Sequence, residues 1–120
     1  MWTVEFADEF DPEFDVLDPA VQDELLAQLA VVEQQGPLAK RPRVDTLKGS
    51  KHANMKELRF SAAGGEWRAA FAFDEERKAI VLVAGDKSGK GSEKRFYKSL
   101  IARADKRFDA HVERLKARRR

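Results

Sequence analysis

Two arginines stand inside short apolar runs of this chain. Arg59 lies in MKELRF (55–60) and Arg68 in EWRAAFAF (66–73). A charged residue is seldom buried in a strand unless an opposite charge meets it. A third run, AIVLVA, continues through GDKSGKGS into a basic segment that carries Tyr97. We therefore expect a small cationic platform for phosphate within residues 47–97.

Alternation along the first two runs predicts which side chains share a face of the sheet. Leu58 and Phe60 fit a core, which turns Glu57 and Arg59 toward the other, open face. In the next run the bulky aromatic residues fit the core and leave Arg68 beside two alanines, with space for a ligand. The two arginines are then expected to converge on one phosphate through their guanidinium forks.

Such a platform suits metal-free cleavage of RNA, which needs a base for the 2′-hydroxyl, cations for the phosphate and an acid for the leaving oxygen. Glu57 is one candidate base, and the alternative is that it only holds Arg59 in an ion pair. Tyr97 belongs either to the site or to the packing of its helix. His52, in a loop, is either a proton-transfer group or an ordinary surface histidine.

Composition excludes several classes of protein. The 120 residues contain no cysteine and two histidines, so disulfides, metal sites and bound cofactors are not expected. No apolar run has the length of a membrane span, and the acidic start MWTVEFADEF differs from a signal peptide. We expect one soluble, cytoplasmic domain over residues 1–120.

Charge is distributed unevenly along the chain, although the net charge is only +2. Residues 1–36 hold ten acidic residues and no lysine or arginine, whereas residues 94–120 hold eleven basic residues and three acidic ones. The basic end suits a polyanion such as RNA, and the alternative is a solvated charged helix. The acidic third is expected to face away from such a substrate.

Periodicity predicts the elements that position these residues. Strands are expected at 2–6, 55–61, 66–73 and 78–85, the last three as an antiparallel meander. Helices are expected after Asp11-Pro12, at 19–35 with Asp18 as cap, and from Ser92 to about Leu115, followed by a frayed tail at 116–120. Residues 37–50 form a Pro-broken connection. The order β-α-α-β-β-β-α indicates an α+β fold, with the two N-terminal helices on one face of an antiparallel-rich sheet and a basic C-terminal helix.

Four segments in this order resemble the RelE/ParE superfamily of bacterial toxins, and most closely its HigB-like, phage-derived branch. These segments are LKGSKHANMKELRF (47–60), EWRAAFAF (66–73), LVAGDKSG (82–89) and SEKRFYKSLI (92–101). The resemblance implies a cytoplasmic ribonuclease that cuts mRNA on the ribosome. It also implies a partner antitoxin, usually one with a helix-turn-helix domain. The helix at 19–35 is then either solvated surface or a dock for a basic antitoxin segment.

The resemblance also implies roles for individual residues. Arg68 matches the strand arginine of the family, Tyr97 the tyrosine near the start of the last helix, and Lys87 a basic residue after the last strand. At Lys56-Glu57 the chain departs from the alternating lysines of well-known members, which leaves the general base unidentified. Further candidates for binding RNA phosphates are Lys56, Lys90, Lys94, Arg95 and His52.

Two other functions remain open on the same fold. One is a gyrase-inhibiting toxin of the ParE type, which binds a protein and performs no RNA chemistry. The other is a catalytically inactive nucleic-acid-binding or regulatory protein, which the missing lysine pattern allows.

Overall fold

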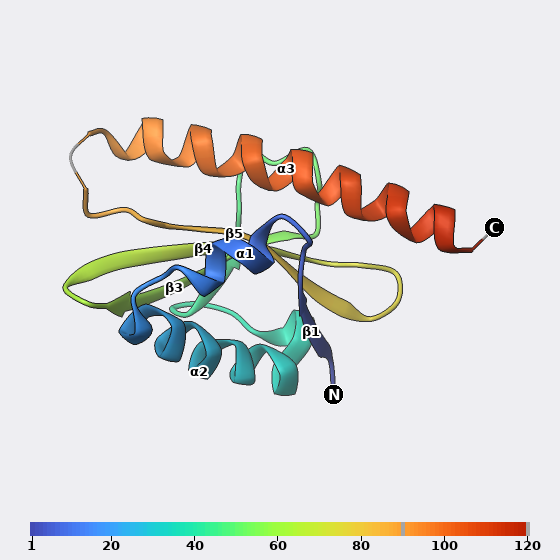
Figure 1. Ribbon diagram of the computed structural model, residues 1–120, viewed down its shortest axis with the longest axis horizontal. Coiled ribbons are helices and arrows are strands. Elements are labelled where there is room, and N and C mark those ends of the chain that lie inside the picture. The colour runs from blue at the N-terminus through green and yellow to red at the C-terminus, as the bar shows by residue number, and fades with distance from the viewer. Residues whose placement is uncertain (90, 120) are drawn as a thin grey trace.

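The computed structural model describes residues 1–89 and 91–119, and it is a five-stranded sheet covered by helices on both faces (Figure 1). The strands lie in the order β1-β5-β4-β3-β2. The elements are β1 (Thr3–Phe6), α1 (Phe10–Asp15), α2 (Pro19–Gln35), a 3-10 turn (Gly36–Leu38), β2 (Val44–Thr46), β3 (Met55–Ala62), β4 (Gly65–Phe73), β5 (Lys78–Asp86) and α3 (Glu93–Arg118).

The expected antiparallel meander is present as β3, β4 and β5. β1 adds to it in parallel beside β5, and the short β2 pairs with the outer side of β3. The α+β class is therefore confirmed, and the predicted elements follow one another in the predicted order with one short strand, β2, in addition. β2 was missed because its three residues lie inside the Pro-broken connection, where no alternating pattern marks a strand.

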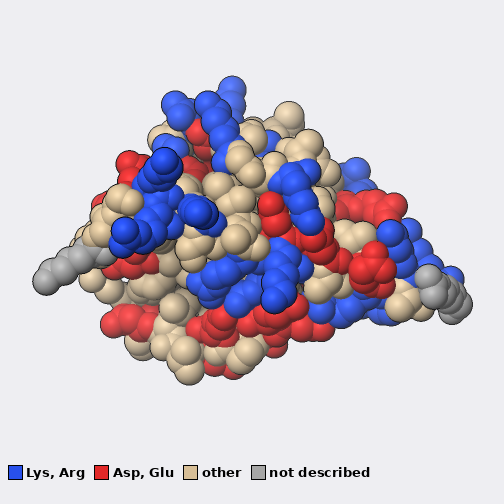
Figure 2. Space-filling view, turned by 90° about the horizontal axis from the view of Figure 1, so that it is seen from above, with Lys and Arg blue, Asp and Glu red and all other residues tan. Residues whose placement is uncertain are grey.

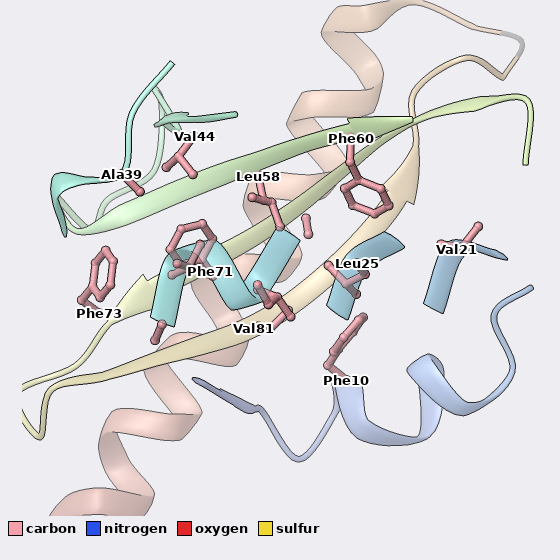
Figure 3. Close-up of a cluster of buried hydrophobic side chains, with 14 residues drawn as sticks. Phe10, Val21, Leu25, Ala39, Val44, Leu58, Phe60, Phe71, Phe73 and Val81 are labelled. Atoms are coloured by element: carbon pink, nitrogen blue, oxygen red, sulfur yellow. The ribbon is translucent and has the colours of Figure 1, made fainter. Parts of the chain in front are cut away.

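The sheet buries side chains on both of its faces. Leu58, Phe60 and Phe71 point toward α2, and Figure 3 shows α3 behind the sheet from them. Alternate residues of the same strands, such as Ala70 and Ala72, pack with α3. The two N-terminal helices thus lie on one face, as expected, and α3 covers the other. β5 needs a cover on each face because its AIVLVA run is apolar on both.

The helix α2 forms where its capping residue and apolar stripe predict it. The Asp18 carboxylate accepts a hydrogen bond of 2.8 Å from the amide of Ala20, which satisfies one free donor of the first turn. Val21, Leu25, Leu29 and Val32 are buried against the sheet. The helix ends at Gly36, whose φ of 56° favours glycine and whose missing side chain makes room for the Trp2 ring.

The helix α3 also follows its predicted stripe, with Ser92 as its cap and Leu100, Ala104 and Phe108 buried. His111 of this helix does not lie on its exposed surface. Its side chain is buried, and its Nε2 lies 2.9 Å from the Asp74 carboxylate. The helix also continues to Arg118 instead of fraying after Leu115.

The acidic start of the chain lies against the basic final helix. The Arg107 guanidinium donates to both oxygens of Glu13, at 2.8 and 2.6 Å, and to the carbonyl of Leu82. Arg114 pairs in the same way with Glu9, 3.2 Å away. From above α3, basic and acidic side chains therefore lie in adjoining groups (Figure 2). Part of the acidic third thus neutralises the helix instead of facing away from it.

Residues 1–89 and 91–119 contain neither a membrane-spanning helix nor a cluster of metal ligands. No helix there is both long enough and apolar enough to cross a membrane. No group of three or more histidine and acidic side chains there converges on a point where a metal ion would bind.

The close packing of α3 on the sheet predicts that a larger side chain between them destabilises the protein. Ala72 is fully buried beneath the helix. Ala72→Leu should lower the free energy of unfolding by about 1–3 kcal/mol, because the core must shift to admit it. Urea denaturation measures this change. The matched control is Ala102→Leu on the exposed side of α3, which should be nearly neutral. Equal effects would contradict the close packing.

The pair between Glu13 and Arg107 predicts a pH dependence. The hydrogen bond from Arg107 holds the pKa of Glu13 below its ordinary value of 4.5. A lowered pKa stabilises the fold above pH 4.5, and this contribution is lost as the pH falls through the folded-state pKa. Glu13→Gln should therefore cost about 1 kcal/mol near pH 7 and progressively less below pH 4.5. Denaturation at several pH values checks this, with Glu113→Gln as the exposed control.

Candidate active site

The two strand arginines are direct neighbours across the sheet. Arg59 on β3 is paired in register with Arg68 on β4, so both side chains leave the same face, as expected. That face is not open, because the first turns of α3 cover it. The Phe96 ring approaches so closely that a Cβ at Gly85, the next residue across from Arg68, would lie 3.1 Å from it.

The alanines beside Arg68 do not leave space for a ligand. Ala70 and Ala72 are both fully buried and pack against Leu100 and Ala104 of α3. Their small side chains bring the helix close to the sheet. The expected ligand space at this position is therefore corrected to a helix-packing surface.

Four polar side chains meet under the start of α3, and we call them the polar cluster: Glu57, Arg59, Arg68 and Tyr97. The Arg59 Nε donates to the Glu57 carboxylate at 2.7 Å. The Arg68 Nε donates to the Tyr97 hydroxyl at 3.2 Å, and its Nη1 donates to the carbonyl of Trp67 at 2.8 Å. The arginines are thus neighbours along the sheet, but their guanidinium groups have different partners.

Burial differs within the polar cluster and sets its electrostatics. Glu57 is 3% exposed and Arg68 is 9% exposed, whereas about a third of the Arg59 side chain reaches solvent. Burial raises the pKa of Tyr97, and the Glu57 carboxylate raises it further, while the hydrogen bond from Arg68 opposes both. The bond to Glu57 raises the pKa of Arg59. At neutral pH the site therefore holds a neutral phenol beside fixed positive charge.

A cavity of about 240 Å³ opens beside the polar cluster, and we call it the helix-side cavity. Glu57, Arg59 and Tyr97 line it, together with Arg41 and Lys48 from the connection before β3. The carboxylates of Asp45 and Glu93 line it too, and Asp45 lies 2.9 Å from the Arg41 guanidinium. Arg68 is not among its lining residues and touches it only through Tyr97. The cavity is smaller than the roughly 300–1,000 Å³ of most ligand sites, which suits one phosphodiester linkage more than a large cofactor.

The basic residues near the start of α3 border this cavity or lie outside it. Lys87 follows β5 and places its Nζ 3.1 Å from Glu93, which itself lines the cavity. Lys94 and Arg95 are exposed in the first turn of the helix. The candidate Lys90 lies outside the described residues.

Two other candidates are held away from the polar cluster. Lys56 projects from β3 on the opposite face to Glu57, and its Nζ donates to the Thr46 hydroxyl at 3.2 Å. The His52 ring packs edge-on against Phe108, and its Nε2 lies 2.8 Å from the Asp109 carboxylate. Asp109 is twelve residues beyond Tyr97, about 18 Å along the helix. The structure therefore brings neither residue to the helix-side cavity.

Sequence reasoning missed Arg41 and Lys48, which line the helix-side cavity. Both lie in the connection at 37–50. The signal available there was the run KRPR at 40–43, a dense group of cations followed closely by a second lysine. Because sequence reasoning treated this run only as a connection, it did not predict that these cations lie beside the strand arginines.

Comparison with known proteins identifies related sequences over most of the chain. Residues 12–109 match the family described as "Phage derived protein Gp49-like". The chain is 42% identical over 97 residues to "Putative toxin HigB2" of Mycobacterium tuberculosis, covering 80% of this chain and 47% of that protein. It is 46% identical over 79 residues to "Putative toxin HigB3" of the same organism, covering 66% of each. The chain thus spans about half the length of the first relative and about two thirds of the second.

One solved structure has a similar fold. The free state of an arginine-to-alanine double mutant of the E. coli toxin RelE aligns with a TM-score of 0.54 at 15% sequence identity. The alignment covers 84% of this chain and 94% of that one. At this identity the likeness concerns the fold.

The polar cluster can be tested through Tyr97, the only tyrosine of the chain. Ultraviolet absorbance of the phenolate should give a pKa above the ordinary value of 10.0, because the ring is partly buried. Glu57→Gln should lower this pKa, since it removes a nearby negative charge. Arg68→Ala should raise it, since it removes a donor and a positive charge.

Circular dichroism at each pH distinguishes titration from alkaline unfolding, and Lys106→Ala on exposed helix surface serves as the control. Shifts of the same sign in the two cluster variants would contradict the proposed arrangement of charges.

Proposed function

Because this chain belongs to the phage-derived Gp49-like family of the RelE superfamily, we propose that it is the toxin of a toxin–antitoxin pair and cleaves ribosome-bound mRNA. The family match confirms the resemblance to the HigB-like branch that the sequence indicated. The observation that carries the enzymatic part is the polar cluster at the wall of a cavity whose lining brings together a carboxylate, a phenol and three cations.

The proposed reaction is attack of the ribose 2′-hydroxyl on the adjacent phosphorus, which displaces the 5′-oxygen of the next nucleotide and leaves a cyclic phosphate. Glu57 is the proposed base, because its carboxylate lines the cavity and is held by Arg59. Arg59, Arg41 and Lys48 surround the phosphate and stabilise its added charge. Tyr97 is neutral and supplies a hydroxyl proton donor at the same wall.

Arg68 receives a different role from the one its sequence position suggested. Its guanidinium bonds the Tyr97 hydroxyl and a backbone carbonyl, and it does not line the cavity. We therefore assign it as a positioning residue, which orients the phenol and adds positive charge behind it. Lys87, Lys94 and Arg95, around the start of α3, are proposed to bind RNA phosphates outside the cavity.

The proposed partners follow from the proposed activity. They are the ribosome with its mRNA and an antitoxin, expected to carry a helix-turn-helix domain, and the proposed compartment is the cytoplasm. The proposed reaction uses protein side chains alone and requires no cofactor or metal.

One observation favours a second candidate function. Glu57 and Arg68 are almost fully buried and have hydrogen-bond partners inside the protein. A purely structural role, holding α3 on the sheet, would be enough to explain such a cluster. That role suits a catalytically inactive member of the family.

Substitution of the proposed base tests the enzymatic proposal. Glu57→Gln should lower the rate of mRNA cleavage on translating ribosomes by about 10²–10⁴, since the amide cannot accept the proton. Primer extension on transcripts after induction maps the cuts. Arg59→Ala should also abolish growth arrest, because it removes a cation from the cavity wall.

The control is Lys106→Ala, which changes an exposed helix residue and should leave cleavage intact. Cuts that persist in both cluster variants would remove Glu57 and Arg59 from the mechanism. Growth arrest with DNA damage and without transcript cuts would favour a gyrase inhibitor of the ParE type. An inert wild-type protein would favour the inactive alternative.

A further inference from the structure

A second and larger cavity, of about 770 Å³, opens between the end of α2 and β2, and we call it the basic groove. Four cations line it: Lys40, Arg41, Arg43 and Arg59. Among its described lining residues there is no acidic side chain. A surface of this kind favours a negatively charged occupant.

The basic groove and the helix-side cavity share two residues. Arg41, which precedes β2, and Arg59, on β3, line both of them. Whatever occupies the basic groove therefore competes for cations that the proposed reaction needs.

The lining of the basic groove suits a polypeptide better than RNA. Gln28 and Gln35 from α2 offer amide donors and acceptors that match a peptide backbone. Leu38 lines the groove with 83% of its surface exposed, an apolar side chain without a cover in the described structure. The described lining contains no aromatic ring on which a base would stack, which is the usual platform for single-stranded RNA.

The free edge of β3 next to the groove also favours a polypeptide over RNA. β2 pairs with β3 only over Lys56–Leu58, with one more bond from the Arg59 amide to the Arg43 carbonyl. Beyond it, residues 60–62 of β3 have no described strand on their outer side. An extended peptide can use such an edge, whereas a nucleic acid cannot.

From these observations we propose that the basic groove binds an extended, acidic, leucine-bearing segment of the antitoxin, an inference that rests on the proposed function. Carboxylates of the segment meet Lys40 and Arg43, and an apolar side chain covers Leu38. The same segment engages Arg41 and Arg59 and so withdraws them from an RNA phosphate. This site is distinct from the basic segment considered for the helix at 19–35, because the end of α2 borders a cationic surface.

The test uses a fluorescein-labelled peptide of repeated Glu-Glu-Leu triplets and a labelled oligouridine of the same net charge. Anisotropy measures binding of each probe to the whole protein. The groove variant is Lys40→Glu with Arg43→Glu, two residues that line the groove but not the helix-side cavity. The matched control is Lys98→Glu with Lys106→Glu on the exposed surface of α3, which carries the same change of charge.

The groove variant should bind the peptide about tenfold more weakly or worse than the wild type, while the control keeps most of the affinity. Equal losses in the two variants, or no peptide binding by the wild type, would overturn the proposal. A selective loss of oligouridine binding in the groove variant would overturn it in favour of an RNA path.

Failure of the enzymatic proposal is distinguishable from failure of this one. The peptide assay needs no catalysis, so an inert protein with groove-dependent peptide binding would refute the nuclease and keep the groove. A groove variant that still cuts mRNA but binds the peptide weakly is the result expected if both proposals hold. Circular dichroism checks that both double variants are folded.

Discussion

Burial of both faces of the sheet is the constraint on which the rest of this structure depends. A strand covered on both sides has no face left for water, so every charged residue on it must find a partner inside the protein. β3 and β4 carry Glu57, Arg59 and Arg68 on the face that α3 covers. The ion pair, the bond to Tyr97 and the bond to the Trp67 carbonyl satisfy that requirement.

The same constraint explains how a reactive site can exist in so small a protein. A buried ion pair contributes little net stability, because desolvation of the charges offsets their attraction. Its effect is on geometry, since buried side chains held by several partners keep one orientation. α3 covers Arg68 completely enough to fix it but leaves part of Arg59 in solvent. The cluster thus combines a fixed, buried arginine, Arg68, with a solvent-accessible one, Arg59. A site that binds a phosphate requires both rigidity and access.

Much of this arrangement could be predicted from the periodicity of apolar residues in the sequence. Alternation in MKELRF and EWRAAFAF placed Leu58 and Phe60 on the face opposite to Arg59, and apolar residues every three or four positions placed Leu100 and Phe108 on one helical stripe. Periodicity reports whether a residue is buried but not what buries it. It therefore missed α3 above the arginines and the buried pair of His111 with Asp74, which joins residues 37 positions apart. The cations at 40–43 were missed because a connection without periodicity carries no information on its place in the fold.

The contacts between the two ends of the chain set the order in which the protein can fold. β1 pairs with β5, about 75 residues later, and Glu9 and Glu13 pair with arginines of α3 about a hundred residues later. Pairings of such long sequence separation form slowly and late. During synthesis β1 and its acidic neighbours must wait until β5 and α3 have emerged. A chain made only as far as β5 therefore lacks the polar cluster, because Tyr97 belongs to α3, which follows β5.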